Sequence, residues 1–202
     1  ISGQFDQWNF RKIGFTPTNT DAQSAWNTAS GSSSTIIAVI DSGLSFTHPD
    51  IVNYNASASP IWGDNNLWVN QDEIPAGIKG AIDGDSNNII TPKEIIDYFV
   101  AQNLDQDSNS IIDYRDVLTT NSVLRNSVDN GSNGYIDDVF GYNFAYSNPN
   151  PNEVANTSGA GHGTHVAGVI AGAVTNNNSR VTPSVASICW SCQIMPLKVI
   201  ND

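Results

Sequence analysis

A short apolar segment that ends in an acid limits the folds open to this chain. Residues 34–40 read STIIAVI, and Asp41-Ser-Gly follows at once. A continuous, largely β-branched run of this length is typical of a strand buried on both faces, as in a parallel sheet. Asp41 would then stand at the carboxyl end of the strand, the edge where open α/β sheets place their ligands. Because a buried acid is unfavourable without a hydrogen-bond partner, we expect Asp41 to have one.

Two later segments extend this pattern. Residues 166–174 are apolar on every side and rich in Ala and Gly, which predicts a buried helix packed closely on a sheet. Residues 188–200 contain QIMPLKVI and predict a second strand, although Pro196 interrupts it. The order strand, long excursion, buried helix, strand indicates an α/β fold. We therefore expect a three-layer, mostly parallel sheet flanked by helices.

The long excursion is acidic. The chain has a net charge of −12, and residues 61–140 hold 14 of its 20 acidic residues but only 4 of its 8 Lys and Arg. Such a surface attracts cations and disfavours nucleic acid as a partner. No apolar run reaches the roughly 18 residues that a transmembrane helix needs, so no membrane span is expected.

One pattern recurs three times inside this acidic segment. Residues 83–94, 105–116 and 129–140, here called loops one, two and three, each begin with an acid, pass through an Asx-rich turn and reach two apolar residues. The loops start 22 and 24 residues apart. Near-regular recurrence indicates a modular unit, so residues 61–140 are predicted to form an insertion within a domain that covers residues 1–202.

The loops resemble EF-hand calcium loops, whose oxygen ligands come from positions 1, 3, 5, 7 (the backbone carbonyl), 9 and 12. In loop one these positions are Asp83, Asp85, Asn87, Ile89, Thr91 and Glu94. In loop two they are Asp105, Asp107, Asn109, Ile111, Asp113 and Asp116. In loop three Asp129, Asn133, the Tyr135 carbonyl and Asp137 could serve, but Gly131 and Phe140 supply no carboxylate. The alternative is a set of ordinary Asx turns.

Details of the first two loops refine this hypothesis. Position 8 is apolar in both, as the pairing of EF-hand loops requires, whereas the usual Gly at position 6 is Asn88 or Ser110. Because Asp116 is shorter than Glu94, we expect loop one to bind Ca²⁺ more tightly. The residues between the loops predict a helix with Thr91 as N-cap and Pro92 and Glu94 in its first turn. Its apolar face would consist of Ile95, Ile96, Phe99 and Val100.

His162 stands between two glycines at the head of the predicted buried helix. For nucleophilic catalysis, a histidine must reach a hydroxyl or thiol and be oriented by a carboxylate on its other ring nitrogen. Asp41 is the natural candidate for that carboxylate. A core histidine is one alternative, and a metal site formed by His162 and His165 is another. The helical zinc motif needs two histidines four residues apart with an adjacent glutamate, which is absent.

The segments AVIDSGLSFTHPDI (38–51) and GHGTHVAGVIAG (161–172) resemble the aspartate and histidine signatures of the subtilisin-like serine proteases. Residues 7–26, 131–145 and 191–199 are similar to the same family. The resemblance implies a subtilisin-like α/β domain, incomplete in this chain, with residues 61–128 largely inserted. It also implies a calcium-stabilised serine endopeptidase that acts on polypeptides. In the family's chain order, Asp41 and His162 would be two members of an Asp-His-Ser triad.

The resemblance also indicates what these residues lack. The family's serine lies in a Gly-Thr-Ser-x-Ala pattern that does not occur in residues 1–202. We therefore expect the serine beyond residue 202, on a C-terminal remainder of the domain, and we expect this chain alone to be inactive. The resemblance further implies that Asp50 helps to hold a structural calcium ion. The alternative function is a calcium-dependent binding or adhesive module built on a vestigial protease scaffold.

Other features bear on the compartment. Cys189 and Cys192 lack a thioredoxin-like context and two further metal ligands, so a local disulfide is favoured over a free thiol pair. The chain starts at Ile1, which fits either removal of a leader or pro-segment or an arbitrary boundary. A disulfide and a demand for calcium are typical of a secreted protein.

Overall fold

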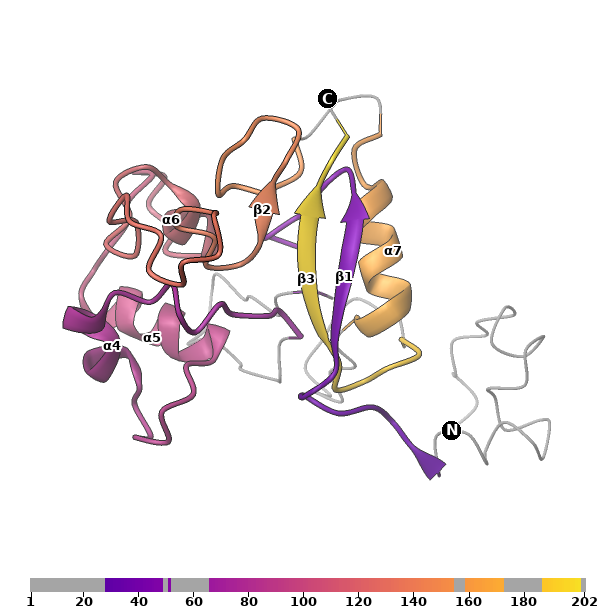
Figure 1. Cartoon of the computed structure of the whole chain (residues 1–202), viewed down its shortest axis with the longest axis horizontal. Coiled ribbons are helices and arrows are strands. Elements are labelled where there is room, and N and C mark those ends of the chain that lie inside the picture. The colour runs from indigo at the N-terminus through magenta and orange to yellow at the C-terminus, as the bar shows by residue number, and fades with distance from the viewer. Residues whose placement is uncertain (1–27, 49–50, 52–65, 155–158, 173–186, 201–202) are drawn as a thin grey trace.

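The computed structural model describes residues 28–48, 51, 66–154, 159–172 and 187–200. Its centre is a sheet of three parallel strands in the order β1-β3-β2. The strands are β1 (Ile36–Asp41), β2 (Tyr142–Asn143) and β3 (Gln193–Lys198). The register of β1 and β3 runs from Ile36 opposite Gln193 to Asp41 opposite Lys198. Figure 1 shows β3 between its two neighbours. The predicted parallel sheet is confirmed.

Pro196 lies inside β3, the central strand, opposite Val39 of β1. A proline there removes a ladder hydrogen bond unless its nitrogen faces a gap. The backbone N–H of Ile194 donates to the carbonyl of Asn66, on the side away from β1. Because alternate residues of a strand point the same way, the Pro196 nitrogen also faces that side. Pairing with β2 starts only at Leu197, so Pro196 interrupts no hydrogen bond there.

Strand β1 is not buried on both faces, in contrast to the expectation from its apolar run. Val39 is buried, but Ile36 and Ile40 are 48% and 65% exposed. The buried face of β1 meets helix α7, and within the described residues α7 is the helix that lies against this sheet. The opposite face therefore has no helical cover among those residues. Two of the three expected layers are seen in this part of the chain.

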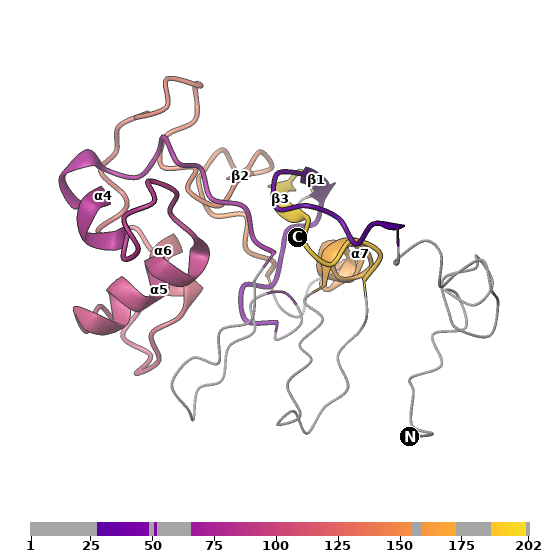
Figure 2. The same cartoon turned by 90° about the horizontal axis from the view of Figure 1, so that it is seen from below.

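Helix α7 (His162–Ala171) begins four residues before the predicted Val166. Gly161 precedes it with a φ of 90°, a left-handed conformation that glycine adopts without strain. A Cβ on Gly163 would overlap the carbonyl oxygen of Gly43 and lie 3.2 Å from the Cβ of Asp41. The start of α7 therefore sits against the end of β1. Figure 2 shows α7 beneath the strands in this view, away from the other helices.

Residues 66–140, the described part of the predicted insertion, carry three helices, α4 (Ala76–Ile82), α5 (Pro92–Ala101) and α6 (Tyr114–Leu118). In Figures 1 and 2 they lie together beyond the β2 edge of the sheet. The capping box predicted for α5 is confirmed, with Thr91 and Glu94 bonded reciprocally. Val100 is 46% exposed, so the predicted apolar face of α5 is narrower than expected. Asp113 and Asp116 form a second capping box at α6.

Three aromatic rings connect the insertion to the sheet. Phe140 packs against Phe46, which follows β1, at a centroid distance of 5.9 Å. Phe140 also meets Tyr114 of α6 edge to face at a centroid distance of 5.6 Å. All three side chains are buried in a core that extends from the strands into the insertion. The insertion therefore packs as part of the same body as the strand end that carries Asp41.

Cys189 and Cys192 form a disulfide just before β3, as expected. Gly31 packs against this pair, because a Cβ there would overlap the Cys189 sulfur. No helix among the described residues is long and apolar enough to cross a membrane.

Candidate active site and acidic loops

The Nδ1 atom of His162 lies 2.7 Å from Oδ1 of Asp41. The strand end delivers the carboxylate and the first turn of α7 delivers the imidazole, because the glycines on both sides let the two backbones approach. The Asp41 side chain is only 12% exposed, whereas that of His162 is 66% exposed. Asp41 is thus largely buried, whereas the His162 ring that is hydrogen-bonded to it is largely exposed.

The surroundings of Asp41 favour its charged form. Burial by itself would raise the pKa of this carboxyl group, but hydrogen bonds from the His162 ring and from the Ser42 backbone N–H outweigh burial. The pKa of Asp41 is therefore lowered below its ordinary value. The Ser42 N–H lies 2.7 Å from Oδ1. An ionised carboxylate here orients the ring and stabilises it when it gains a proton.

The Nε2 atom of His162 makes no hydrogen bond within the described residues. With Nδ1 held by Asp41 and the ring largely exposed, Nε2 is left to accept a proton from a reacting group. The arrangement suits a general base that later acts as an acid. Nucleophilic catalysis would need, besides such a histidine and carboxylate, a hydroxyl or thiol within reach of Nε2.

A buried polar network lies directly behind this pair and has no sequence signature. It consists of Ser42, Glu153 and Thr164, which are 1%, 9% and 7% exposed. The hydroxyl groups of Ser42 and Thr164 both donate to the Glu153 carboxylate, at 2.8 and 2.6 Å. Sequence reasoning missed Glu153 because 111 residues separate it from Ser42. No local pattern marks such a contact.

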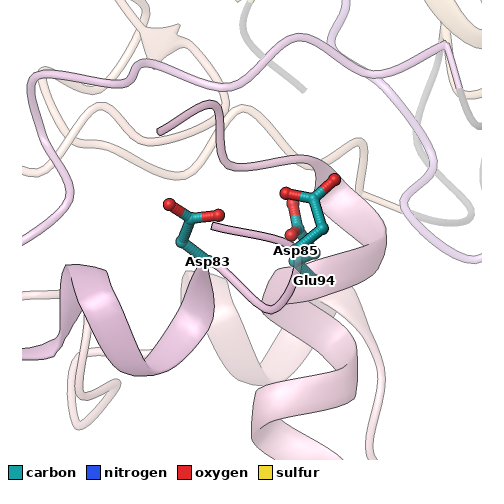
Figure 3. Close-up of side chains that lie close together, drawn as sticks. All are labelled: Asp83, Asp85 and Glu94. Atoms are coloured by element: carbon teal, nitrogen blue, oxygen red, sulfur yellow. The ribbon is translucent and has the colours of Figure 1, made fainter. Parts of the chain in front are cut away.

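In loop one, the side chains of Asp83, Asp85 and Glu94 lie close together, as Figure 3 shows. Each offers a carboxylate oxygen within 4.8 Å of the others. The Glu94 carboxylate accepts hydrogen bonds from the backbone N–H groups of Gly84 and Thr91. Asn87, at position 5, donates to Asp85 through its side-chain amide. Positions 1, 3, 5 and 12 are thus brought together, whereas Thr91 acts as the helix cap.

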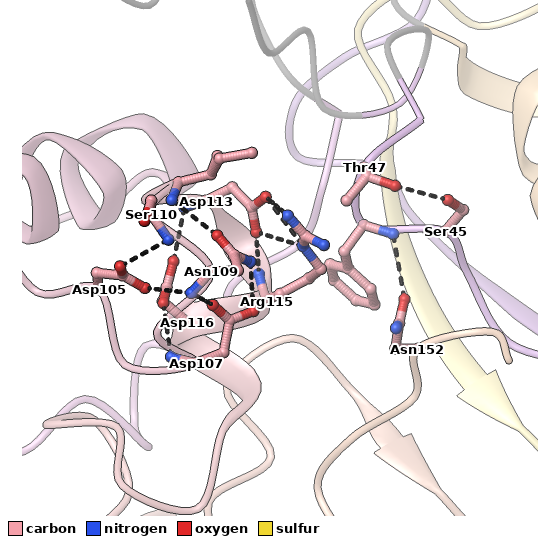
Figure 4. Close-up of polar contacts among 12 residues, drawn as sticks. Ser45, Thr47, Asp105, Asp107, Asn109, Ser110, Asp113, Arg115, Asp116 and Asn152 are labelled. Atoms are coloured by element: carbon pink, nitrogen blue, oxygen red, sulfur yellow. Dashed lines mark hydrogen bonds and ion pairs between the residues drawn. The ribbon is translucent and has the colours of Figure 1, made fainter. Parts of the chain in front are cut away.

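Loop two repeats this arrangement, shown in Figure 4. Asp105, Asp107 and Asp116 each place a carboxylate oxygen within 4.8 Å of the others. Asp116 is fully buried and accepts from the N–H groups of Gln106, Asp107 and Asp113. Asp113, at position 9, instead caps α6 and pairs with Arg115. The Asp113 carboxylate therefore bonds within the first turn of α6 and is not grouped with the acids of the loop centre.

Loop three differs from its sequence prediction. Asp129 accepts from the N–H groups of Asn133 and Gly134, as the first acids of the other loops do from equivalent residues. The carboxylate of Asp137 instead accepts from the N–H groups of Asn126 and Ser127. It also pairs with Arg125 at 3.8 Å. Its hydrogen bonds thus lie in another turn, and Asp137 is not grouped with Asp129.

Glu73 occupies the place of the missing position-12 acid in loop three. It is fully buried, and its two carboxylate oxygens accept from the N–H groups of Gly131 and Asp137. In loop two, Asp116 accepts from the N–H groups at the same two positions, Asp107 and Asp113. Burial, followed by the nearby charge of Glu73, raises the pKa of Asp138 to about 6, although Asn133 and Asn70 donate hydrogen bonds that oppose the rise. Glu73 is thus an acid from outside the repeat that bonds to the backbone of loop three.

The backbones of the three loops agree. Position 4 is Ser86, Ser108 or Ser132, with φ values of 61°, 59° and 52°. Position 6 is Asn88, Ser110 or Gly134, with φ values of 67°, 69° and 92°. The position-7 carbonyls of Ile89, Ile111 and Tyr135 accept no hydrogen bond from other described residues. Convergent carboxylates beside an unpaired carbonyl fit a hard cation such as Ca²⁺.

The loops do not pair as an EF-hand pair would. The backbone N–H and carbonyl of Ile90, at position 8 of loop one, both bond to the side chain of Gln71. The backbone of Ile90 is thus held by a side chain from outside the loops and not by loop two. The expectation of EF-hand-style pairing is therefore wrong.

Two further predictions concern other metal sites. Asp50 lies outside the described residues. Within the described part of the chain, neither of the grouped sets of potential ligands contains a histidine. His165 is exposed on α7, so nothing in that part supports a metal centre built on His162 and His165.

Comparison with known proteins agrees with this geometry. The model of the Subtilase family matches residues 32–202, which include both the strand end at Asp41 and the helix start at His162. No curated protein matches the chain.

Proposed function

The chain belongs to the subtilase family, and we propose that it forms the N-terminal part of a serine endopeptidase domain with Asp41 and His162 as triad members. The contact between Nδ1 of His162 and Oδ1 of Asp41, at 2.7 Å, carries the proposal. A buried, ionised carboxylate on one ring nitrogen leaves the other nitrogen for proton transfer. Polypeptide is the substrate class that the family membership supports.

The residues of this chain would divide the chemistry as follows. His162 Nε2 removes the proton from a serine hydroxyl as that oxygen attacks the scissile carbonyl carbon. The imidazolium that results donates its proton to the leaving amine nitrogen when the C–N bond breaks. Asp41 keeps the Nδ1 proton in place and stabilises the imidazolium without itself being protonated. A water molecule deacylates the serine by the same proton path.

We place the serine on a segment beyond residue 202. The proposal rests on the absence of a Gly-Thr-Ser-x-Ala pattern in residues 1–202. The exposed His162 ring is consistent with a partner segment closing over it. Residues 1–202 alone are therefore expected to bind no serine-directed reagent covalently at a triad serine and to hydrolyse no peptide.

The test compares residues 1–202 with a longer protein that includes the segment following Asp202. A generic peptide substrate and Ca²⁺ are supplied to both, and a serine-directed reagent is added in parallel. We expect turnover only in the longer protein and its loss with the reagent. In that protein Asp41→Asn should lower kcat by about 10⁴-fold, the size seen when a triad aspartate is replaced. Reagent-resistant turnover by residues 1–202 would disprove the proposal, and inactivity of the longer protein would favour a binding module.

We further propose that loops one and two bind Ca²⁺. Loop one would use Asp83, Asp85, Asn87, Glu94 and the Ile89 carbonyl. Loop two would use Asp105, Asp107, Asn109, Asp116 and the Ile111 carbonyl. Thr91 and Asp113 at position 9 cap helices here and would act, if at all, through water, which is common at that position. The ion would reduce the repulsion among three clustered carboxylates and stabilise the folded loop.

We propose loop three as a weaker Ca²⁺ site, to which Glu73 contributes a carboxylate from outside the loop. Asp129, Asn133 and the Tyr135 carbonyl come from the loop, and Glu73 supplies the carboxylate that position 12 lacks. The hydrogen bonds from Gly131 and Asp137 to Glu73 support this substitution because they match those that Asp116 receives from positions 3 and 9 of loop two. Asp137 is held by Asn126 and Ser127 and would have to turn to take part. Extracellular calcium would suit such sites, so we also propose that the protein is exported.

A further inference from the structure

Glu153 is anchored to the loop that follows β1. Its backbone N–H donates to the carbonyl of Leu44, and the N–H of Leu44 donates to the carbonyl of Pro151. These bonds place the segment before α7 alongside the residues that follow Asp41. The Glu153 side chain then points into the interior and is 9% exposed. Within the described residues no basic side chain pairs with it.

Two hydroxyl groups bridge the strand end and the helix through this carboxylate. The N–H of Gly163 donates to Ser42 Oγ at 3.0 Å, and Ser42 donates to Glu153 Oε1 at 2.8 Å. The N–H of Ser45 donates to Thr164 Oγ1 at 2.8 Å, and Thr164 donates to Glu153 Oε2 at 2.6 Å. Each hydroxyl therefore both accepts from backbone and donates to Glu153. Every N–H and O–H donor in this chain of bonds therefore has an acceptor.

We propose that Glu153 is a positioning residue for the Asp41–His162 pair, acting through the hydroxyl groups of Ser42 and Thr164. This inference rests on the proposed function. Ser42 follows Asp41 directly, and Thr164 lies two residues after His162, so the network joins the backbone of both partners. Glu153 orients both hydroxyl groups. Each hydroxyl oxygen in turn accepts a backbone hydrogen bond that joins residues 42–45 to the first turn of α7: Ser42 accepts from Gly163, and Thr164 accepts from Ser45.

The directional character of the network explains why a carboxylate is suited to this position. A carboxylate can only accept hydrogen bonds, so the protons of both hydroxyl groups point toward Glu153. The lone pairs of the two hydroxyl oxygens then face the backbone N–H groups of Gly163 and Ser45. An amide in place of the carboxylate turns an N–H₂ toward one hydroxyl and leaves a buried donor without an acceptor. Loss of this order lets α7 shift against the strand end, and small shifts of reacting groups are enough to reduce turnover.

The test uses nuclear magnetic resonance of residues 1–202, because the Asp41–His162 contact needs no serine. The proton on Nδ1 of His162, hydrogen-bonded to Asp41, gives a downfield signal that is assigned by its loss in Asp41→Asn. We expect Glu153→Gln and Thr164→Val to abolish or broaden this signal, whereas Thr164→Ser, which keeps the hydroxyl, retains it. Ser122→Ala is the control, because it removes another buried hydroxyl that accepts from Leu124 far from the pair. It should leave the signal unchanged.

The outcomes separate this inference from the proposed function. A wild-type signal that persists unchanged in folded Glu153→Gln and Thr164→Val overturns the positioning role and leaves the triad assignment intact. Absence of the signal in the wild type, with no change in Asp41→Asn, overturns both. Loss of the signal in Thr164→Ser as well as in Thr164→Val shows that packing and not the hydroxyl is responsible, and this also overturns the inference. A longer protein with the serine provides a second measurement, in which Glu153→Gln should lower kcat by about 10²-fold with KM unchanged.

Discussion

Gly163, in the first turn of α7, lies against the carbonyl oxygen of Gly43 so closely that no side chain fits between them. The two glycines let the helix that carries His162 approach the strand end that carries Asp41. Gly163→Ala should therefore push α7 away and weaken the contact between the two side chains. We expect a loss of roughly 1–3 kcal/mol in the free energy of unfolding, the usual range for overpacking. Urea unfolding measures it.

Gly168→Ala is the matched control for this substitution. It lies in the same helix, and nothing lies within 4 Å of a Cβ placed there. Because Ala is a better helix former than Gly, this variant should gain up to about 1 kcal/mol. Equal effects of the two substitutions would contradict the proposed close approach.

His162→Ala should raise the pKa of Asp41. Burial of the carboxyl group remains in this variant, but the hydrogen bond and the charge interaction that oppose burial are gone. In the wild type the lowered pKa of Asp41 stabilises the fold above the ordinary aspartate pKa, and this stabilisation is lost as pH falls through the lower folded value. The variant should lack most of this stabilisation, so the free energy of unfolding should depend less on pH in the acid range. Carbon NMR of the Asp41 carboxyl group during a pH titration measures the change, with His165→Ala on the exposed side of α7 as the control.

Removal of calcium should destabilise the protein. A ligand that binds only the folded state stabilises it by about 2.7 kcal/mol at 100 times its Kd, which corresponds to roughly 5–10 °C in Tm for a chain of this size. Melting in excess Ca²⁺ and in excess chelator gives the difference. If the two Tm values coincide, and Mg²⁺ gives the same value, the loops do not bind Ca²⁺ in the folded protein.

Glu94→Gln should weaken calcium binding at loop one. Affinity depends on the number of charged ligands, so we expect a loss of roughly 10-fold or more. Asp97→Asn is the control, because Asp97 lies three residues further along α5 and pairs with Lys93 instead of facing the loop. Titration calorimetry distinguishes the two variants. A comparable loss in both would point to general electrostatics and not to ligation.

Reduction of the Cys189–Cys192 disulfide should have a modest effect. The bond closes a loop of sequence separation 3, and so short a loop is expected to contribute only about 2 kcal/mol through chain entropy. Unfolding with and without reductant measures this contribution. Complete unfolding on reduction would mean that the disulfide orders more of the chain than its own loop, including the strand that follows it.

Features that depend on neighbouring residues were open to prediction from the sequence. The capping box of α5 needs only residues 91–94, and the turns of loops one and two need only their own Asx side chains. Strand β1 and helix α7 were predicted from their apolar patterns, though the start of α7 was misplaced because Gly and His seldom begin a buried helix. The proximity of Asp41 and His162 was inferred from the strand end and from the family resemblance.

Features that depend on distant residues were not open to such prediction. The exposure of Ile36 and Ile40 depends on which helices cover the sheet. An apolar run in the sequence does not show whether one face of its strand is covered or both. The backbone bonds of Ile90 went to Gln71, 19 residues earlier, and not to loop two. The side chain of Asp137 bonded to another turn, because two backbone N–H groups there gave it partners that a loop pattern cannot show.

The amino-acid order alone therefore defined the strand, the helix, the three acidic turns and the two residues proposed as triad members. Each follows from short-range preferences or from a motif of adjacent residues. The folded chain added the buried carboxylates that join remote segments: Glu153 meets Ser42 across 111 positions and Glu73 meets Gly131 across 58. Neither contact has a periodic or local signature, because it exists only after the backbone has brought an N–H or hydroxyl donor to an acid that water no longer reaches.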